Sequence, residues 1–194
     1  MSKRISIYIA SWMINNNVIK NEERALYEYC YSYLIENALY AVIILFISIF
    51  IDCFDIGVVL VSFQFVLRVT GGGAHASTRS VCTIVSYGQD VLILILVPML
   101  VNIPSTCWIV SFILGYVIIF TTVPVDCPNK RLDDKQKKEY RRRCLLCLSV
   151  ITVLFITFIH YNLWRLYITT AFCVIIDAVG LMIGIMNNRK AEKC

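Results

Sequence analysis

Charged residues are scarce in this chain of 194 residues, since Asp, Glu, Lys and Arg make up 16% of it, against 59% hydrophobic residues. The mean hydropathy of +0.73 is far above that of a water-soluble domain, which excludes a soluble enzyme. Charge is absent altogether from residues 37–51, 91–125, 144–164 and 166–176. Because about 20 helical residues cross the ~30 Å apolar core of a bilayer, the sequence predicts an all-α, polytopic membrane protein. The crossings leave no room for a soluble domain, so we expect residues 1–194 to form one membrane-embedded domain.

Histidine is rarer still, with two residues, and the nine cysteines do not follow the spacing of a small disulfide-linked domain. Most cysteines lie inside apolar runs, where Cys behaves as a small hydrophobic residue. Six cysteines have no His or Cys at metal-ligand spacing, so we expect no metal and no cofactor; these are Cys30, Cys53, Cys107, Cys127, Cys173 and Cys194. The N-terminal residues also lack the continuous apolar region and the cleavage site of a signal peptide, so we expect the N-terminus to be retained.

Apolar segments predict about six crossings, near residues 34–51, 56–68, 90–104, 107–123, 144–161 and 166–186. The second is short for a crossing, and Pro98 and Pro104 interrupt the run of residues 91–125. Asn21, followed by two glutamates, is a suitable start for the helix that leads into the first crossing. Before it, residues 1–20 predict an amphipathic helix on the membrane surface. Its apolar stripe at helical spacing consists of Ile5, Tyr8, Ile9, Trp12 and Met13.

Positive charge is concentrated in one segment. Residues 128–143 carry eight Lys and Arg against three Asp and Glu, and their net charge of +5 equals the formal net charge of the whole chain. Outer turns at residues 52–55, 104–106 and 160–165 then contain a single basic residue, Arg165. Under the positive-inside rule, we predict that the basic loop at residues 124–143 and both termini face the cytoplasm of a bacterial cell.

The stretch from Arg68 to Cys82 brings together groups suited to chemistry. The consecutive residues Gly71, Gly72 and Gly73 interrupt a helix at membrane depth, where irregular backbone persists only inside protein or beside a wet cavity. His75 follows, and Cys82 lies seven residues further on. An imidazole can deprotonate a thiol, and a thiolate can attack a peptide carbonyl to form an acyl-enzyme.

Spacing alone leaves this interpretation open. On one straight helix, His75 and Cys82 would lie ~10 Å apart along the axis, beyond the ~3 Å of a hydrogen bond, so the glycine segment must fold back. A plain cytoplasmic linker with an incidental histidine and a core cysteine explains the stretch equally well.

The residues R-x-x-G-G-G-A-H-A at positions 68–76, followed by Cys82, resemble the signature of the AgrB (accessory gene regulator B) family of membrane endopeptidases in Gram-positive peptide quorum sensing. The resemblance extends to chain length, the amphipathic N-terminal segment, Pro124 before a basic loop, and two closing crossings. It implies that His75 and Cys82 are the catalytic pair of a cysteine endopeptidase, and it does not specify which residue would be a third member of the catalytic set. The supporting motif positions would be Arg68, Gly71, Gly72 and Gly73.

The resemblance also implies the reaction and its partners. An enzyme of this family cuts the precursor peptide AgrD on the C-terminal side of the future signal. Cys82 would take the acyl group, and a cysteine of the peptide would displace it to close a thiolactone ring, which exclusion of water favours over hydrolysis. AgrD has an amphipathic N-terminal helix and an acidic C-terminal tail, which the basic loop would attract. We expect the chain to form a homodimer and to bind this precursor and membrane lipid, but no nucleic acid. The residues expected to bind the acidic tail are Lys137, Lys138, Arg141 and Arg142.

Other residues admit other interpretations. Cys144 and Cys147 have the spacing of thiol oxidoreductases, although no Gly, Pro or His lies beside them. His160 stands at an outer turn, in a position typical of an interfacial structural residue. Asp177 is a carboxylate within an apolar crossing, which favours a structural pairing with a cation or a backbone donor over catalysis.

The alternative function is that of a small transporter or export component for a peptide, with Asp52, Asp177 and the glycine break along its path. The two functions differ in one requirement, because only the peptidase needs the thiol of Cys82.

Overall fold

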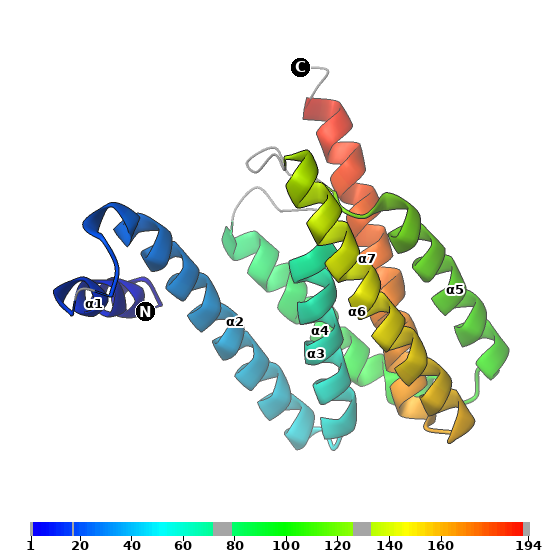
Figure 1. Cartoon of the computed structure of the whole chain (residues 1–194). Helices are drawn as coiled ribbons and strands as arrows, with labels where there is room; N and C mark the ends of the chain where they lie inside the picture. The colour runs from blue at the N-terminus through cyan, green and yellow to red at the C-terminus, as the bar shows by residue number, and fades with distance from the viewer. Residues whose placement is uncertain (1, 17, 72–78, 126–132, 192–194) are drawn as a thin grey trace. The chain divides into compact units, whose positions relative to one another are not determined.

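The computed structural model describes residues 2–16, 18–71, 79–125 and 133–191, and these residues form helices without a strand (Figure 1). The helices in chain order are α1 (Ser2–Asn15), the short 3₁₀ helix η1 (Asn21–Glu23), α2 (Arg24–Phe50), α3 (Phe54–Gly71), α4 (Arg79–Met99), α5 (Ser105–Thr122), α6 (Asp134–His160) and α7 (Trp164–Ala191). The all-α fold predicted from the sequence is confirmed.

Five helical segments are long and apolar enough to cross a membrane: Asn21–Phe50, Phe54–Gly71, Ser105–Thr122, Asp134–His160 and Trp164–Asn187. The apolar part of α4, Thr83–Met99, is shorter. Large apolar side chains on these helices are widely exposed, which is the arrangement expected where lipid rather than water covers them. The chain is therefore a multi-pass membrane protein, and its helices agree with the prediction of about six membrane segments.

Two of the tight turns predicted between crossings follow from one backbone motif. Asp52 after α2 and Asn162 after α6 have left-handed backbone angles, with φ of 55° and 56°. The next residue in each turn donates its amide to a carbonyl five residues earlier: Cys53 to Ser48 at 2.7 Å, and Leu163 to Phe158 at 2.8 Å. This is the Schellman ending of a helix, and Asp and Asn tolerate its left-handed residue better than most side chains do.

Helix α6 begins earlier than the charge pattern indicates, because the basic segment predicted as a loop is helical from Asp134 onward. Asp133 caps the helix: its Oδ1 accepts the amide of Asp134 at 2.8 Å, and its own amide donates to Oε1 of Gln136 at 3.2 Å. Such a capping box satisfies amides that have no partner within the helix. The basic residues after Asp134 therefore have fixed positions around a helix.

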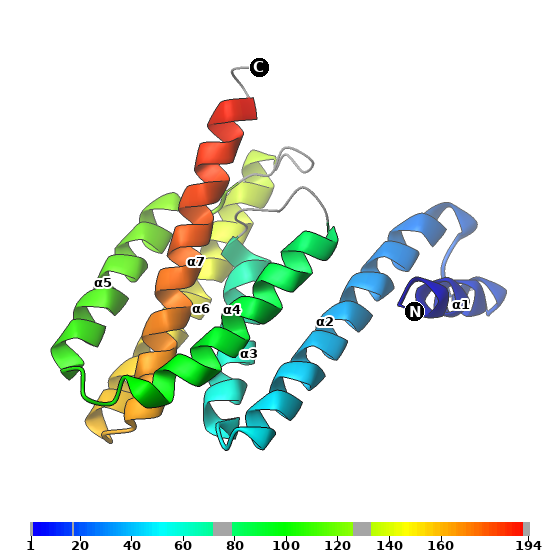
Figure 2. The ribbon, with the colours of Figure 1, turned by 180° about the vertical axis from the view of Figure 1, so that it is seen from behind.

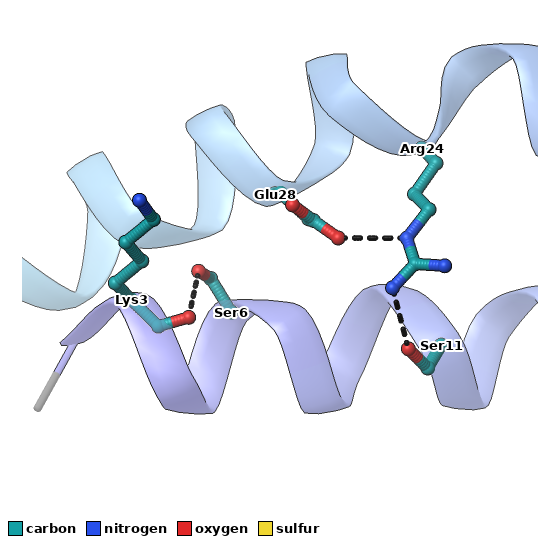
Figure 3. A network of polar contacts seen from close by, with 5 residues as sticks. All are labelled: Lys3, Ser6, Ser11, Arg24 and Glu28. Atoms are coloured by element: carbon teal, nitrogen blue, oxygen red, sulfur yellow. Dashed lines mark hydrogen bonds and ion pairs between the residues drawn. The ribbon is translucent and has the colours of Figure 1, made fainter.

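Residues 1–46 form one compact unit, in which α1 lies along the first part of α2. Ser2 Oγ donates to Oε1 of Glu36 at 2.8 Å, and Nη2 of Arg24 donates to Ser11 Oγ at 3.4 Å. Arg24 is itself held by Glu28, with 2.8 Å between Nε and Oε1 (Figure 3). The start of α1 therefore lies beside the middle of α2 and its end beside the start of α2, so the two helices run antiparallel.

The two sides of α1 differ in burial as an amphipathic surface helix requires. Ser6 and Ala10 are buried, whereas Ile5, Tyr8 and Trp12 of the predicted apolar stripe are 39%, 73% and 56% exposed. Apolar side chains of α1 that α2 leaves exposed suit contact with lipid. The interfacial position of α1 stays a prediction.

Residues 47–194 form the second unit, in which α7 is the central helix and contacts α3, α4, α5 and α6 (Figure 2). Helix α5 packs closest, because Gly115 lets it approach Val174: a Cβ at position 115 would lie 2.9 Å from Cγ1 of Val174. Phe112 of α5 stacks on Phe155 of α6, with 4.0 Å between ring centroids. The core of this unit is therefore a bundle assembled around α7.

Helices α3 and α7 run parallel and are joined by ion pairs at two levels. Near their first residues, Arg165 Nη2 lies 3.0 Å from Oδ1 of Asp55 and also donates to the carbonyl of Asp52 at 2.8 Å. About three turns later on both helices, Arg68 lies beside Asp177. The second pair belongs to the motif region.

Candidate active site

Helix α3 ends at Gly71, where the glycine triplet begins, and this end is enclosed by three other segments. A Cβ at position 71 would lie 3.7 Å from Val123 after α5, 3.9 Å from Cys144 in α6 and 3.9 Å from Leu181 in α7. The carbonyl of Gly71 accepts the amide of Val125 at 3.3 Å. Packing and this hydrogen bond thus fix the backbone of the motif as far as Gly71, the last residue of α3.

Arg68, in the last turn of α3, reaches two other helices of the bundle. Its Nε lies 3.8 Å from Oδ1 of Asp177 in α7, and its Nη1 donates to Oγ of Ser86 in α4 at 2.7 Å. The side chain of Asp177 is 11% exposed and that of Arg68 is 36% exposed. Charged groups within an apolar crossing are stabilised by such pairing, so Asp177 has the cationic partner that its place in the sequence predicts. One side chain of the motif therefore joins α3, α4 and α7.

The partner of Arg68 on α4 identifies the face of that helix turned toward α3. Ser86 lies four residues after Cys82 and four before Asp90, and residues spaced by four share one face of a helix. Cys82 belongs to the first turn of α4, although its side chain lies outside the part of the chain that the structure describes. Because Arg68 bonds Ser86, this face of α4 is turned toward the end of α3. Position 82 lies on the same face.

Two further polar residues lie deep in the bundle next to this junction. Asp90 is 0% exposed, and Gln64, one turn before Arg68 on α3, is 1% exposed. Within the described ranges, none of their side-chain oxygen and nitrogen atoms has a hydrogen-bond partner. Asp90 and Gln64 thus extend the polar face of α4 and α3 one turn further into the bundle from Ser86 and Arg68.

Sequence reasoning missed Ser86, Gln64 and Asp90. The signal that would have found them is the repeated spacing of four, from Cys82 through Ser86 to Asp90 and from Gln64 to Arg68. The periodicity of apolar residues indicates lipid-facing and core positions. The polar residues of α3 and α4 come together only through the packing of the two helices, which the sequence does not give.

Three of the predicted site residues, Gly72, Gly73 and His75, lie outside the described residues, as does the side chain of Cys82. The catalytic pair therefore stays a prediction. Its two flanks are described, since α3 ends at Gly71 and α4 begins at Arg79.

The second histidine lies far from this region. His160 is the last residue of α6, and 16 residues separate it from Cys144, which lies beside Gly71. At 1.5 Å per residue that is about 24 Å along the helix. The ring of His160 instead meets that of Tyr161 edge-on, with 5.1 Å between centroids. Proximity to Cys82 in the chain therefore favours His75 as the base.

The pair Cys144 and Cys147 stands at the motif end of α6. Both thiols are free; Cys144 is fully buried and Cys147 is partly buried. A dithiol that exchanges with a partner needs an accessible sulfur, so the burial of Cys144 fits a packing role. The ranges that the structure describes also contain no group of three or more His, Cys, Asp or Glu side chains able to hold a metal ion.

The basic residues expected to attract the substrate lie in the first turns of α6. Lys138, Arg141 and Arg142 are exposed and Lys137 is partly buried. Their spacing places these four on one side of the helix, hereafter the basic face of α6. Arg143 lies on the other side, where it forms an ion pair with Glu139.

Comparison with known proteins gives one family. The family model described as accessory gene regulator B (AgrB) matches residues 6–183 of the chain. An AgrB-like protein 2 of Clostridium perfringens (strain 13 / Type A) is 28% identical over 179 residues, which cover 86% of this chain and 82% of the relative. An AgrB-like protein of Clostridium perfringens (strain SM101 / Type A) is 32% identical over 181 residues, which cover 86% and 80%. No solved structure matches the chain significantly.

Proposed function

Because the chain belongs to the accessory gene regulator B family, we propose that it is a membrane cysteine endopeptidase that processes the precursor of a quorum-sensing peptide. The match extends over residues 6–183 and therefore includes the motif, both of its flanking helices and the basic face of α6. This match is the observation that carries the proposal.

In the proposed reaction, His75 takes the proton of the Cys82 thiol, and the thiolate attacks the carbonyl of the scissile peptide bond. The C-terminal part of the precursor leaves as an amine, which takes up the proton, and the N-terminal part stays on Cys82 as a thioester. The thiol of a cysteine within the peptide then attacks this thioester, which releases Cys82 and closes a thiolactone ring. Thioester exchange is nearly isoenergetic, so a site that excludes water favours ring closure over hydrolysis.

Two features of the described helices support this assignment. Position 82 lies in the first turn of α4, and the amino end of a helix stabilises a nearby negative charge such as a thiolate. The same helix is tied to the end of α3 through Ser86 and Arg68 at 2.7 Å. His75 lies in the chain between the end of α3 and the start of α4, and the bond from Arg68 to Ser86 joins these two helices.

The orientation and the partners belong to the same proposal. Lys and Arg are in excess at the start of α6, and under the positive-inside rule this end of the bundle faces the cytoplasm. The motif and both termini would then lie on the cytoplasmic side as well. The basic face of α6 would then meet an acidic tail of the precursor at the inner membrane surface, where anionic lipid also lies. We further propose a homodimer, in line with the expectation from the resemblance.

The test is co-expression of the chain with a candidate precursor peptide in a host without either, followed by mass measurement of the products. The wild-type chain is expected to yield a shortened peptide 18 Da lighter than its linear form, as ring closure requires. Cys82→Ala and Cys82→Ser are expected to yield none while accumulating in the membrane normally. The matched control is Cys147→Ser, which changes a partly buried cysteine of α6 and should process normally. Processing by either Cys82 variant would contradict the proposal and leave the transporter as the better interpretation.

A further inference from the structure

We infer that Asp177 is a positioning residue of the peptidase, which holds Arg68 against Ser86 and thereby sets the first turns of α4, where Cys82 lies. The inference rests on the proposed function, because it concerns the placement of the nucleophile that this function requires. It assigns to a carboxylate in the middle of α7 a role in a reaction that occurs at the start of α4.

Packing anchors the second half of α4, where Ile93, Leu94 and Val97 are at most 2% exposed, whereas its motif end relies more on a polar contact. Helix α4 contacts α3 and α7 less extensively than these two helices contact each other. At its motif end, the side chains of Ile84 and Val85 are 69% and 60% exposed, so these two residues add little packing against the bundle. Apolar contacts are also non-directional, whereas a hydrogen bond fixes both distance and angle. The 2.7 Å bond from Arg68 to Ser86 therefore contributes to the orientation of the first turns of α4.

Arg68 makes this bond reliably only while Asp177 holds its other side. The guanidinium is planar and presents its N–H groups in a rigid fork, so fixing Nε beside Asp177 also fixes the direction of Nη1. Arg68 is 36% exposed, and a long cationic side chain without a buried partner extends toward water. Loss of the Asp177 charge would therefore release Arg68 from Ser86 as well.

The expected consequence is a loss of turnover rather than of binding. A displacement of about 1 Å in a reacting group costs on the order of 100-fold in rate. We therefore expect Asp177→Asn to lower kcat for precursor cleavage by about 10- to 100-fold. KM should stay within about 3-fold of wild type, because the basic face of α6 and the lipid-bound part of the precursor are unchanged.

The chain offers a matched control in the second ion pair between the same helices. Asp55 of α3 and Arg165 of α7 lie 3.0 Å apart near the first residues of these helices, about three turns from the pair of Arg68 and Asp177. If Asp177 served only to join α3 to α7, Asp55→Asn would be as harmful as Asp177→Asn. On our account, Asp55→Asn keeps kcat within about 2-fold of wild type.

The experiment measures kcat and KM for a synthetic precursor with the full-length protein in liposomes. The variants are Asp177→Asn, Asp177→Glu, Ser86→Ala and Asp55→Asn, with Cys82→Ala as the inactive reference. Asp177→Glu, which restores the charge, should recover a large part of the lost kcat. Ser86→Ala, which removes the hydrogen bond from a small side chain without disturbing the ion pair, should lower kcat by about 10-fold. Ser86→Ala also decides the matter if Asp177→Asn does not accumulate in the membrane.

Normal kcat in Asp177→Asn or in Ser86→Ala would overturn the inference, as would an equal loss in Asp55→Asn. These outcomes would leave the proposed function intact as long as Cys82→Ala remains inactive. Cleavage by Cys82→Ala would instead overturn the proposed function, and the inference with it.

Discussion

His75 is the residue to which the proposed chemistry assigns the proton of the nucleophile. A free thiol is only a few per cent ionised at neutral pH, and a positioned general base contributes about 10²- to 10⁴-fold to such a step. We therefore expect His75→Ala to lower cleavage at pH 7 by at least about 100-fold. The residual activity should rise with pH, because hydroxide ionises the unaided thiol. His160→Ala, at the far end of α6, is the control and should behave as wild type. Full activity of His75→Ala at neutral pH would assign the base elsewhere.

Among the residues that the structure describes, Asp90 differs from Asp177 in having no cationic partner. Both carboxyl oxygens of Asp90 are buried without a hydrogen-bond partner in the described ranges. An amide in the same place is cheaper to bury than a carboxylate. We therefore expect Asp90→Asn to keep or raise the thermal unfolding temperature in detergent, whereas Asp177→Asn lowers it by leaving Arg68 unpaired. A fall for Asp90→Asn as large as that for Asp177→Asn would show that Asp90 has a stabilising partner.

The packing of α5 on α7 depends on the absence of a side chain at Gly115. A Cβ there would lie 2.9 Å from Cγ1 and 3.1 Å from the backbone carbonyl of Val174, so one of the two helices must shift. Overpacking of this kind costs about 1–3 kcal/mol, and we expect Gly115→Ala to lower the free energy of unfolding by that amount. The control is Gly88→Ala on α4, where no atom lies within 4 Å and Ala is the better helix former by about 1 kcal/mol. The measurement is denaturation of both variants in the same detergent. Equal stability of the two variants would contradict the close approach of α5 to α7.

The basic face of α6 is predicted to attract the precursor without taking part in the chemistry. Exposed charges act over a Debye length of about 8 Å at physiological salt, so they assist encounter more than they hold a bound complex. Replacing Lys138 and Arg142 by Gln should raise KM and weaken its salt dependence while kcat stays near normal. The matched comparison is Arg142→Gln with Arg143→Gln, each of which removes one positive charge, from the basic face and from the opposite side of α6. If the two changes act alike, or if neither affects KM, the basic residues determine topology only.

At the scale of the whole molecule, the sequence predicts features that depend on local composition. The all-α fold and about six crossings follow from apolar runs, and two tight turns fall where Asp52 and Asn162 provide left-handed residues. The start of α6 at Asp134 was missed, because the density of charge concealed the capping box around Asp133. The sequence also predicts a partner for Asp177 but not its identity, because Arg68 lies over 100 residues away and meets it only through the packing of α3 on α7.

The most direct test of the central claim is to trap the acyl-enzyme. A precursor in which the ring-forming cysteine is replaced by alanine can still acylate the enzyme but cannot displace it by ring closure. Incubated with the protein in liposomes and analysed by peptide mass mapping, it should leave its N-terminal part attached to Cys82 through a bond that hydroxylamine cleaves. His75→Ala should slow formation of this adduct, and Cys82→Ala should prevent it. An adduct on another cysteine, such as Cys144, or cleavage of the unmodified precursor by Cys82→Ala, would contradict the account.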